Sequence, residues 1–233
     1  MRLFMNYGEA LEEIRRDLGE MGILIHPRTY QNKDVSQDPN FETLELRNYI
    51  YTVVNPQNLK GLEELVTQPW ADIEFQDRIS GEPLNPGNAY KHRGNVWDEF
   101  LDEEGKLDGY SYPERFNYFG NINQIEEIIA EAKDNPDSRQ LYLSIWDPRD
   151  ILNLGGKHRV PCTLGYQISI REGKLNLTYL QRSADFATHL PNDIYLAVKL
   201  QGYLAQRLSI EPGNFTHWIG SLHIFKKDAQ GIF

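Results

Sequence analysis

The segment PNDIYLAVKLQGYLAQRL, residues 191–208, restricts the possible folds more than any other stretch of this chain. A proline opens its first turn, and apolar side chains then occupy most sides of the helix that its spacing predicts. Lys199, Gln201 and Gln206 interrupt the apolar run, so the helix is too short and too polar to span a bilayer. We therefore expect a central helix that other elements bury inside a globular domain, with no membrane partner.

Hydrophobic spacing also predicts the elements around this helix. Apolar residues at helical intervals indicate helices at residues 7–19, at residues 58–79 with an interruption at Pro69, and at residues 121–138. Alternating apolar and aromatic residues indicate strands at residues 41–54, 141–146 and 214–225, and a hairpin of residues 162–170 and 175–180. Residues 78–96 contain several Gly and Pro and are a predicted loop. Helices and hairpins mix without strict alternation, which indicates the α+β class with a mixed sheet covered by helices.

Composition narrows the organisation and the possible partners. The chain has no repeat, low-complexity tract or linker, so we predict a single domain over residues 1–233. A net charge of -10 argues against a nucleic-acid partner, although a few arginines in one pocket could still bind a small phosphate. The N-terminus has no uninterrupted apolar run of the signal-peptide type, and one cysteine cannot form an intramolecular disulfide. These features favour a cytoplasmic protein.

Cys162, the single cysteine, follows a proline at the start of a predicted strand. One interpretation is a small buried hydrophobe, as most unpaired cysteines are. A metal site is not expected, because there is no CxxC or HExxH motif and the six histidines are scattered. The other interpretation is a reactive thiol whose pKa a nearby arginine lowers, with His223 on a strand that could return to the same pocket. A polar cluster at the entry to the buried helix supports it: Arg182, Ser183, Asp185 and Asp193.

Several separated motifs support the reactive interpretation. The segments NPDSRQLYLSIWDPRDI, VPCTLGYQ, YLQRSADFATHLPNDIYLA and GNFTHWIGSLHIF follow one another in this order, and GNVWDEFLDEEGKLDGYSYPERF precedes them. Together they resemble the thymidylate synthase superfamily, from about Arg28 to the end of the chain. The resemblance implies a thymidylate synthase-like fold, a homodimer joined sheet to sheet, and Cys162 as the nucleophile.

The resemblance also implies the chemistry and the ligands. In this superfamily the thiolate adds to carbon 6 of a pyrimidine nucleoside monophosphate, and carbon 5 then attacks the one-carbon unit of 5,10-methylenetetrahydrofolate. Besides Cys162, the matching positions suggest Tyr112 near the thiol and Glu74, with Glu64 as the alternative, as the catalytic glutamate. Trp97 and Asp185 match positions that contact the folate.

Eight positions match residues that bind the nucleotide: Arg28, Arg139, Gln181, Arg182, Ser183, Asp193, His223 and Phe225. Of these, Arg28, Arg182 and Ser183 would bind the phosphate, and Arg139 would reach the phosphate of the partner subunit in the homodimer. The chain departs from the family in two places. Gln140 stands where a second arginine is usual, and Phe225 stands where a tyrosine reads the 3′-hydroxyl, so the choice between ribose and deoxyribose stays open.

Asp193 is the position that predicts the base. Synthases acting on uracil have Asn there, whose amide can donate to the 4-carbonyl, whereas a carboxylate only accepts and suits the 4-amino group of cytosine. Cytidylate hydroxymethylases of the superfamily show this Asp, and they also read CT where this chain has Cys162 and Thr163. We therefore expect folate-dependent 5-hydroxymethylation of dCMP or CMP. The alternatives are a cytidylate methyltransferase, a thymidylate synthase and a non-catalytic nucleotide-binding relative.

Overall fold

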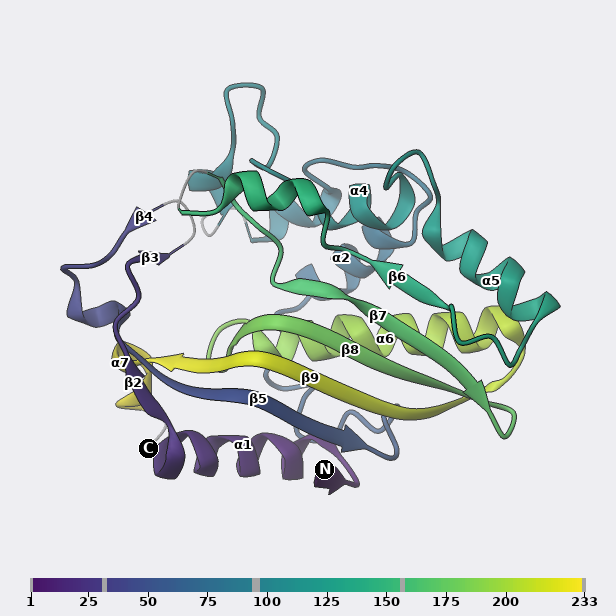
Figure 1. The fold of residues 1–233 in the computed structure, drawn as a ribbon, viewed down its shortest axis with the longest axis horizontal. Helices are drawn as coiled ribbons and strands as arrows, with labels where there is room; N and C mark the ends of the chain where they lie inside the picture. Colours follow the sequence, from purple (N-terminus) through teal and green to yellow (C-terminus); the bar gives the residue numbers. More distant parts are fainter. Residues whose placement is uncertain (1, 31–32, 94–96, 156–157, 232–233) are drawn as a thin grey trace.

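The computed structural model describes residues 2–30, 33–93, 97–155 and 158–231. Its centre is a seven-stranded sheet in the order β1-β5-β9-β8-β7-β6, with β2 also paired to β5 (Figure 1). The strands of this sheet are β1 (Arg2–Phe4), β2 (Ile23–Ile25), β5 (Thr43–Val53), β6 (Tyr142–Ser144), β7 (Thr163–Arg171), β8 (Lys174–Asp185) and β9 (Glu211–Phe225). A small second sheet pairs β3 (Thr29–Tyr30) with β4 (Lys33–Asp34).

The helices pack around this sheet. They are α1 (Tyr7–Met21), α2 (Trp70–Arg78), α4 (Tyr112–Asn117), α5 (Gln124–Asp134), α6 (Leu190–Leu208) and α7 (Lys226–Ala229). Short 3₁₀ turns lie at η1 (Pro39–Phe41), η2 (Asn88–His92), η3 (Asp98–Phe100) and η4 (Pro148–Asn153). The mixture of helices and a mixed sheet fits the predicted α+β class and a thymidylate synthase-like fold.

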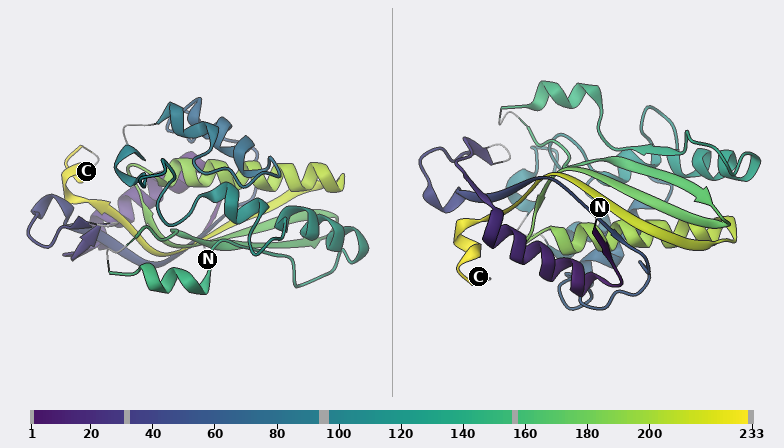
Figure 2. Two further views of the ribbon diagram at one scale, coloured as in Figure 1. Left: turned by 90° about the horizontal axis from the view of Figure 1, so that it is seen from above. Right: turned by 60° about the horizontal axis from the view of Figure 1, so that its bottom comes forward.

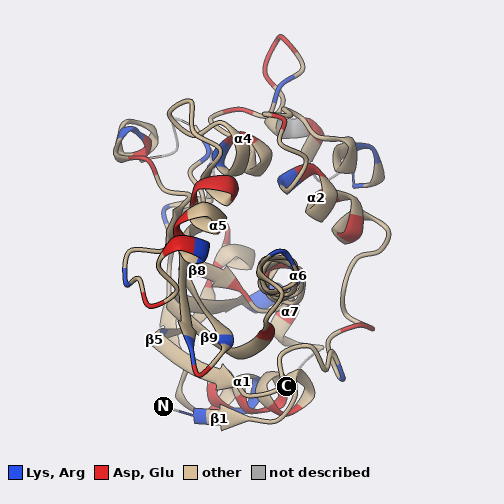
Figure 3. Cartoon of the chain, turned by 90° about the vertical axis from the view of Figure 1, so that its right-hand side faces the viewer, with Lys and Arg blue, Asp and Glu red and all other residues tan. Residues whose placement is uncertain are grey.

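Helix α6 is the central element, as its sequence predicts. Figure 3 shows it between the sheet on one side and α2 on the other. Leu196, Leu200 and Leu204 are buried, and Gln201, a buried polar side chain in the middle of the helix, donates to the carbonyl of Leu175 at 2.9 Å. No helix among the described ranges is both long and apolar enough to cross a membrane.

The connection through α6 makes β8 and β9 parallel, whereas β5–β9 and β7–β8 are antiparallel. A parallel pair needs a long crossover, and α6 supplies it. The resulting register places Ser183 beside Ser221 and Asp185 beside His223. The carboxyl ends of β8 and β9 therefore bring residues about forty positions apart in the sequence to the same end of the sheet.

The opposite face of the sheet carries an apolar row. Figures 1 and 2 show α6 on one face of β8 and β9, and no long helix of the described chain lies across the other. In register across three strands lie Ile50, Trp218 and Leu180. Ile50 is 41% exposed and the other two are partly exposed. We call these three residues the outer row.

The helix predicted over residues 58–79 is wrong in its first half, where the chain makes turns until α2 begins at Trp70. Gly61 has φ = 80°, outside the helical region, and lies against Gly8 of α1, whose N–H donates to the carbonyl of Lys60 at 3.0 Å. The segment thus packs against the start of α1 and does not form a helix. The strand predicted at 141–146 is shorter, and the predicted loop at 78–96 contains η2, while its residues 94–96 lie outside the described residues.

Candidate active site

A cavity of about 420 Å³ opens at the carboxyl ends of β8 and β9, within the usual size of small-molecule sites. Its walls come from α2, from the residues around α4, from the entry to β7 and from the first turn of α6. Ten of the side chains predicted to be functional line it: Glu74, Trp97, Tyr112, Cys162, Arg182, Ser183, Asp185, Asp193, His223 and Phe225. The fold thus gathers in one cavity residues that the sequence spreads over 150 positions.

Arg182 is fixed against the segment that ends at the cysteine. Its backbone N–H donates to the carbonyl of Cys162 at 2.8 Å, and its Nε donates to that of Pro161 at 2.8 Å. Its Nη2 donates to the carbonyl of Val160 at 3.2 Å and lies 3.9 Å from Sγ of Cys162. The guanidinium is therefore held beside the sulfur before any ligand arrives.

Burial affects the pKa of the Cys162 thiol more than Arg182 does. It raises the pKa of Cys162 above its ordinary value, while Arg182 opposes the rise and the carboxylates of Asp193 and Asp185 add to it. The expectation of a lowered thiol pKa is therefore wrong for the protein without ligand. Arg182 still favours the thiolate, but it does not outweigh the loss of solvent.

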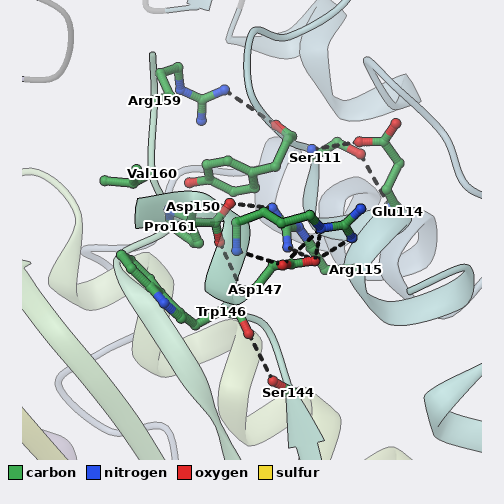
Figure 4. Close-up of polar contacts among 12 residues, drawn as sticks. Ser111, Glu114, Arg115, Ser144, Trp146, Asp147, Asp150, Arg159, Val160 and Pro161 are labelled. Carbon is green, nitrogen blue, oxygen red and sulfur yellow. Dashed lines mark hydrogen bonds and ion pairs between the residues drawn. The ribbon is translucent and has the colours of Figure 1, made fainter. Parts of the chain in front are cut away.

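The segment before the cysteine is anchored to α4 by a buried ion pair. Figure 4 shows Arg115 beside Asp147 and Asp150, which bracket the first turn of η4. Its Nη2 donates to Asp150 Oδ1 at 2.7 Å, and Asp150 Oδ2 accepts from the backbone N–H of Asp147 at 2.9 Å. These contacts fix the chain upstream of Cys162, and removing one partner of such a pair leaves a buried charge alone.

Asp193 reaches the cavity from the first turn of α6. Its Oδ2 accepts from Nε2 of Gln181 at 2.7 Å, and its Oδ1 has no hydrogen bond from any described residue. Burial raises the pKa of this carboxyl, and His189 and the Gln181 hydrogen bond oppose the rise. Gln181, predicted at the nucleotide, is 1% exposed and does not line the cavity. The structure places it behind Asp193.

Glu74 and Tyr112 form the wall opposite Asp193 through Arg78, which the sequence analysis did not single out. The Nε of Arg78 donates to Glu74 Oε1 at 2.8 Å, and its guanidinium stacks 3.9 Å from the ring centre of Tyr112. Burial raises the pKa of Glu74, which favours a protonated carboxyl near neutral pH more than in water. Glu64, the alternative, is exposed and does not line the cavity.

His223 and Asp185 face the cavity from neighbouring strands. The Nδ1 of His223 donates to the carbonyl of Ser221 at 3.4 Å, which leaves Nε2 for a ligand, and burial lowers the pKa of this imidazole. The carboxylate of Asp185 accepts one hydrogen bond from a described residue, the N–H of Ala187 at 3.1 Å. Phe225 packs edge-on against His223 with ring centres 5.4 Å apart.

Two predicted phosphate ligands are not in this cavity. Arg28 and Arg139 are exposed and line no part of it. Arg28 follows a cavity residue, Pro27, and Arg139 lies in the turn before β6. Contact of Arg139 with a partner subunit stays a prediction.

The cavity contains cationic and polar residues that the sequence analysis missed. Besides Arg78, they include Arg93, Arg159, His189 and Asn192. Arg159 is 4% exposed among aromatic rings, with its guanidinium 5.0 Å from Trp97 and 4.8 Å from Tyr110. Only its position three residues before Cys162 could have drawn attention to it, since an isolated arginine in a loop looks like a surface residue.

The thymidylate synthase family model matches residues 85–232, which is more than half of the chain. This chain belongs to the thymidylate synthase family. The matched span includes Cys162, Asp193 and His223, whereas Glu74 and Arg28 precede it. Thymidylate synthases transfer a one-carbon unit from methylenetetrahydrofolate to a pyrimidine nucleotide, so the family assigns the chain to the one-carbon transferases of nucleotide metabolism.

The residues present fit a folate beside a nucleotide. A pterin needs a flat apolar wall and an acceptor for its N–H groups. The Trp97 ring supplies such a wall, and Asp185 has acceptor capacity beyond its one hydrogen bond to Ala187. Trp97 and Asp185 are therefore the residues that would hold the cosubstrate next to the cysteine.

Proposed function

We propose that this thymidylate synthase relative converts a cytidine monophosphate to its 5-hydroxymethyl derivative. The observation that carries the proposal is the carboxylate of Asp193 in the cavity, with Oδ2 held by Gln181 and Oδ1 available to a ligand. Methylenetetrahydrofolate supplies the one-carbon unit. The reacting atoms would lie between Cys162 and the Glu74–Arg78 pair.

Cys162 begins the chemistry by bonding Sγ to carbon 6 of the base, which makes carbon 5 nucleophilic. Arg182 stabilises the thiolate at 3.9 Å and contributes positive charge for the phosphate. After carbon 5 has accepted the one-carbon unit and lost its proton, tetrahydrofolate leaves through its nitrogen, water adds to the exocyclic methylene carbon so formed, and Sγ leaves carbon 6. Glu74, with its raised pKa, is suited to hold that water or pass on its proton.

Asp193 would select the base by the polarity of its hydrogen bonds. A carboxylate accepts from the 4-amino group of cytosine, but it faces the 4-carbonyl of uracil with no hydrogen between the two oxygens. A good base contact discriminates by roughly 1–3 kcal/mol, and a buried unpaired acceptor adds to that difference. This argument favours cytidylate over uridylate.

The test is mass spectrometry of the products formed from dCMP, CMP and dUMP, each with methylenetetrahydrofolate. We expect addition of CH₂O to a cytidylate, with no rise in dihydrofolate absorbance. Cys162→Ser is the inactive control. A methylated cytidylate with dihydrofolate would instead show the reductive methyltransferase, and thymidylate from dUMP alone would overturn the assignment.

Asp193→Asn is expected to lower kcat/KM for cytidylate at least tenfold and to raise it for uridylate, because the amide can donate to a carbonyl. The measurement is the ratio of the two kcat/KM values. Glu64→Gln removes an exposed acid outside the cavity and is the matched control. An unchanged ratio in Asp193→Asn would remove the base assignment.

We also propose that two copies of the chain pair through the outer row. Ile50, Trp218 and Leu180 supply adjacent apolar surface on a face that no long helix of the described chain covers. In such a pair, Arg139 would be the candidate to reach the partner's phosphate site.

A further inference from the structure

An aromatic row crosses the inner face of the sheet beneath the cavity. In register on four neighbouring strands lie Tyr51, His217, Tyr179 and Tyr166. The rings of Tyr166 and Tyr179 stack with centres 4.9 Å apart, and those of Tyr179 and His217 with centres 4.5 Å apart, both at 14° between planes. All four residues are at most 1% exposed. His217 thus sits inside a packed row that fixes the plane of its ring.

Hydrogen bonds lead from this row to the cavity. Tyr51 Oη lies 3.0 Å from Nδ1 of His217, and Nε2 of His217 lies 2.9 Å from Oε1 of Gln181. The other end of the same amide, Nε2 of Gln181, donates to Asp193 Oδ2 at 2.7 Å. We call this series of three hydrogen bonds the Asp193 relay. It joins β5, β9, β8 and α6.

The donor and the acceptor of each hydrogen bond in the relay can be assigned from the Gln181 amide. Oε1 of Gln181 can only accept, so Nε2 of His217 carries the proton. Nδ1 of the neutral ring is then the acceptor, and Tyr51 is the donor. Burial lowers the pKa of His217 to about 3, and no charged side chain of the described residues contacts the ring. A neutral ring with one fixed tautomer therefore stands behind Gln181.

Gln181 would behave differently without this ring. A free amide can turn away from Asp193, and the carboxylate then loses a hydrogen bond that favours its charged form. The carboxyl would then protonate more readily, and a proton on Oδ1, the oxygen that Gln181 does not contact, could donate to a carbonyl. Because burial already favours protonation of Asp193, the hydrogen bond from Gln181 helps to decide whether Oδ1 accepts or donates.

We propose that His217 is a positioning residue for base selection, because it holds the Gln181 amide so that Asp193 presents an acceptor to the nucleotide. The inference rests on the proposed function, since it needs Asp193 to face the base. It adds that the preference for cytosine is set partly in the interior of the sheet, by a side chain that touches neither substrate.

The experiment measures binding of dCMP and dUMP by titration calorimetry, together with kcat/KM, for His217→Phe and His217→Gln. Phe keeps a ring in the aromatic row but cannot donate to Gln181, so we expect the dCMP:dUMP preference to fall at least tenfold. Gln can donate to Oε1 again, and we expect it to restore most of the preference. A purely structural role would weaken both nucleotides equally, and that result would overturn the inference.

Two further variants keep the test decisive. If His217→Phe does not fold, Tyr51→Phe removes the hydroxyl that fixes the tautomer, and we expect a loss of preference of a few-fold; an unchanged ratio would overturn the inference. Asp193→Asn in the same assay separates the two proposals. If it changes the preference while His217→Phe does not, only the relay fails, and if it changes nothing, the base assignment fails.

Discussion

Cys162 and Asp193 are both acids whose charged forms are opposed by burial, and each has a close polar neighbour among the groups that favour the charge. For the thiol this neighbour is Arg182 at 3.9 Å, and for the carboxyl it is the Gln181 amide at 2.7 Å. In both cases burial is the larger influence on the pKa. The charge state of each residue therefore depends on its surroundings, on burial first and on these neighbouring side chains second.

Arg182→Gln is expected to slow alkylation of Cys162 at neutral pH, because the thiolate loses the nearest positive charge. The wild-type thiol pKa is already raised, so its alkylation rate should climb only above the pH of an ordinary cysteine. In Arg182→Gln, the pH at which the alkylation rate of Cys162 rises should be higher still. The measurement is the rate of iodoacetamide labelling from pH 6 to 10. Arg139→Gln, an exposed position, is the control, and coincident profiles for all three proteins would contradict the expectation.

At the scale of the elements, the turns before α2 depend on contact between two glycines. A Cβ added to Gly61 would come 2.4 Å from Cα of Gly8, and Gly61 also has φ = 80°. An alanine there meets both a backbone clash and an unfavourable conformation. The docking of this segment onto α1 therefore requires glycine.

Gly61→Ala is expected to lower the free energy of unfolding by about 3 kcal/mol or more, as a clash between backbones adds to conformational strain. Gly105→Ala is the matched control, because Gly105 has φ = 77° but nothing within 4 Å of an added Cβ. Conformational strain alone should lower the free energy of unfolding of Gly105→Ala by about 1 kcal/mol. Urea denaturation of the two variants measures the difference. Equal losses would show that the contact with Gly8 is unimportant.

The local sequence pattern predicted the regular helices and strands, in which apolar residues face the core at fixed intervals. Helix α6, the β7–β8 hairpin and β9 follow from hydrophobic spacing, and the motifs that resemble the family predicted ten of the side chains that line the cavity. The turns at Gly61 could not be predicted, because they depend on α1, fifty residues earlier. Arg93 and Arg159 were missed since nothing nearby in the sequence shows that a loop arginine turns inward, and the place of Gln181 behind Asp193 follows from packing between β8 and α6.

At the scale of the whole molecule, the cavity lies at the carboxyl ends of β8 and β9, and the outer row lies on the sheet face that α6 does not cover. Trp218→Arg is expected to leave the chain monomeric, because a charge in the centre of an apolar interface is costly to bury. Sedimentation velocity measures the change. Ile122→Arg replaces an exposed apolar residue between α4 and α5 and is the control. A wild-type chain that is already monomeric would contradict the proposed pairing.

The outer row and the aromatic row are immediate neighbours along the same three strands: Ile50 precedes Tyr51, His217 precedes Trp218, and Tyr179 precedes Leu180. Only the backbone of these strands separates the surface proposed to bind a second copy of the chain from the side chains proposed to influence the choice of pyrimidine. A one-residue insertion in any of these strands would exchange its two faces, so it would turn the outer-row side chain inward and the aromatic-row side chain outward at the same time.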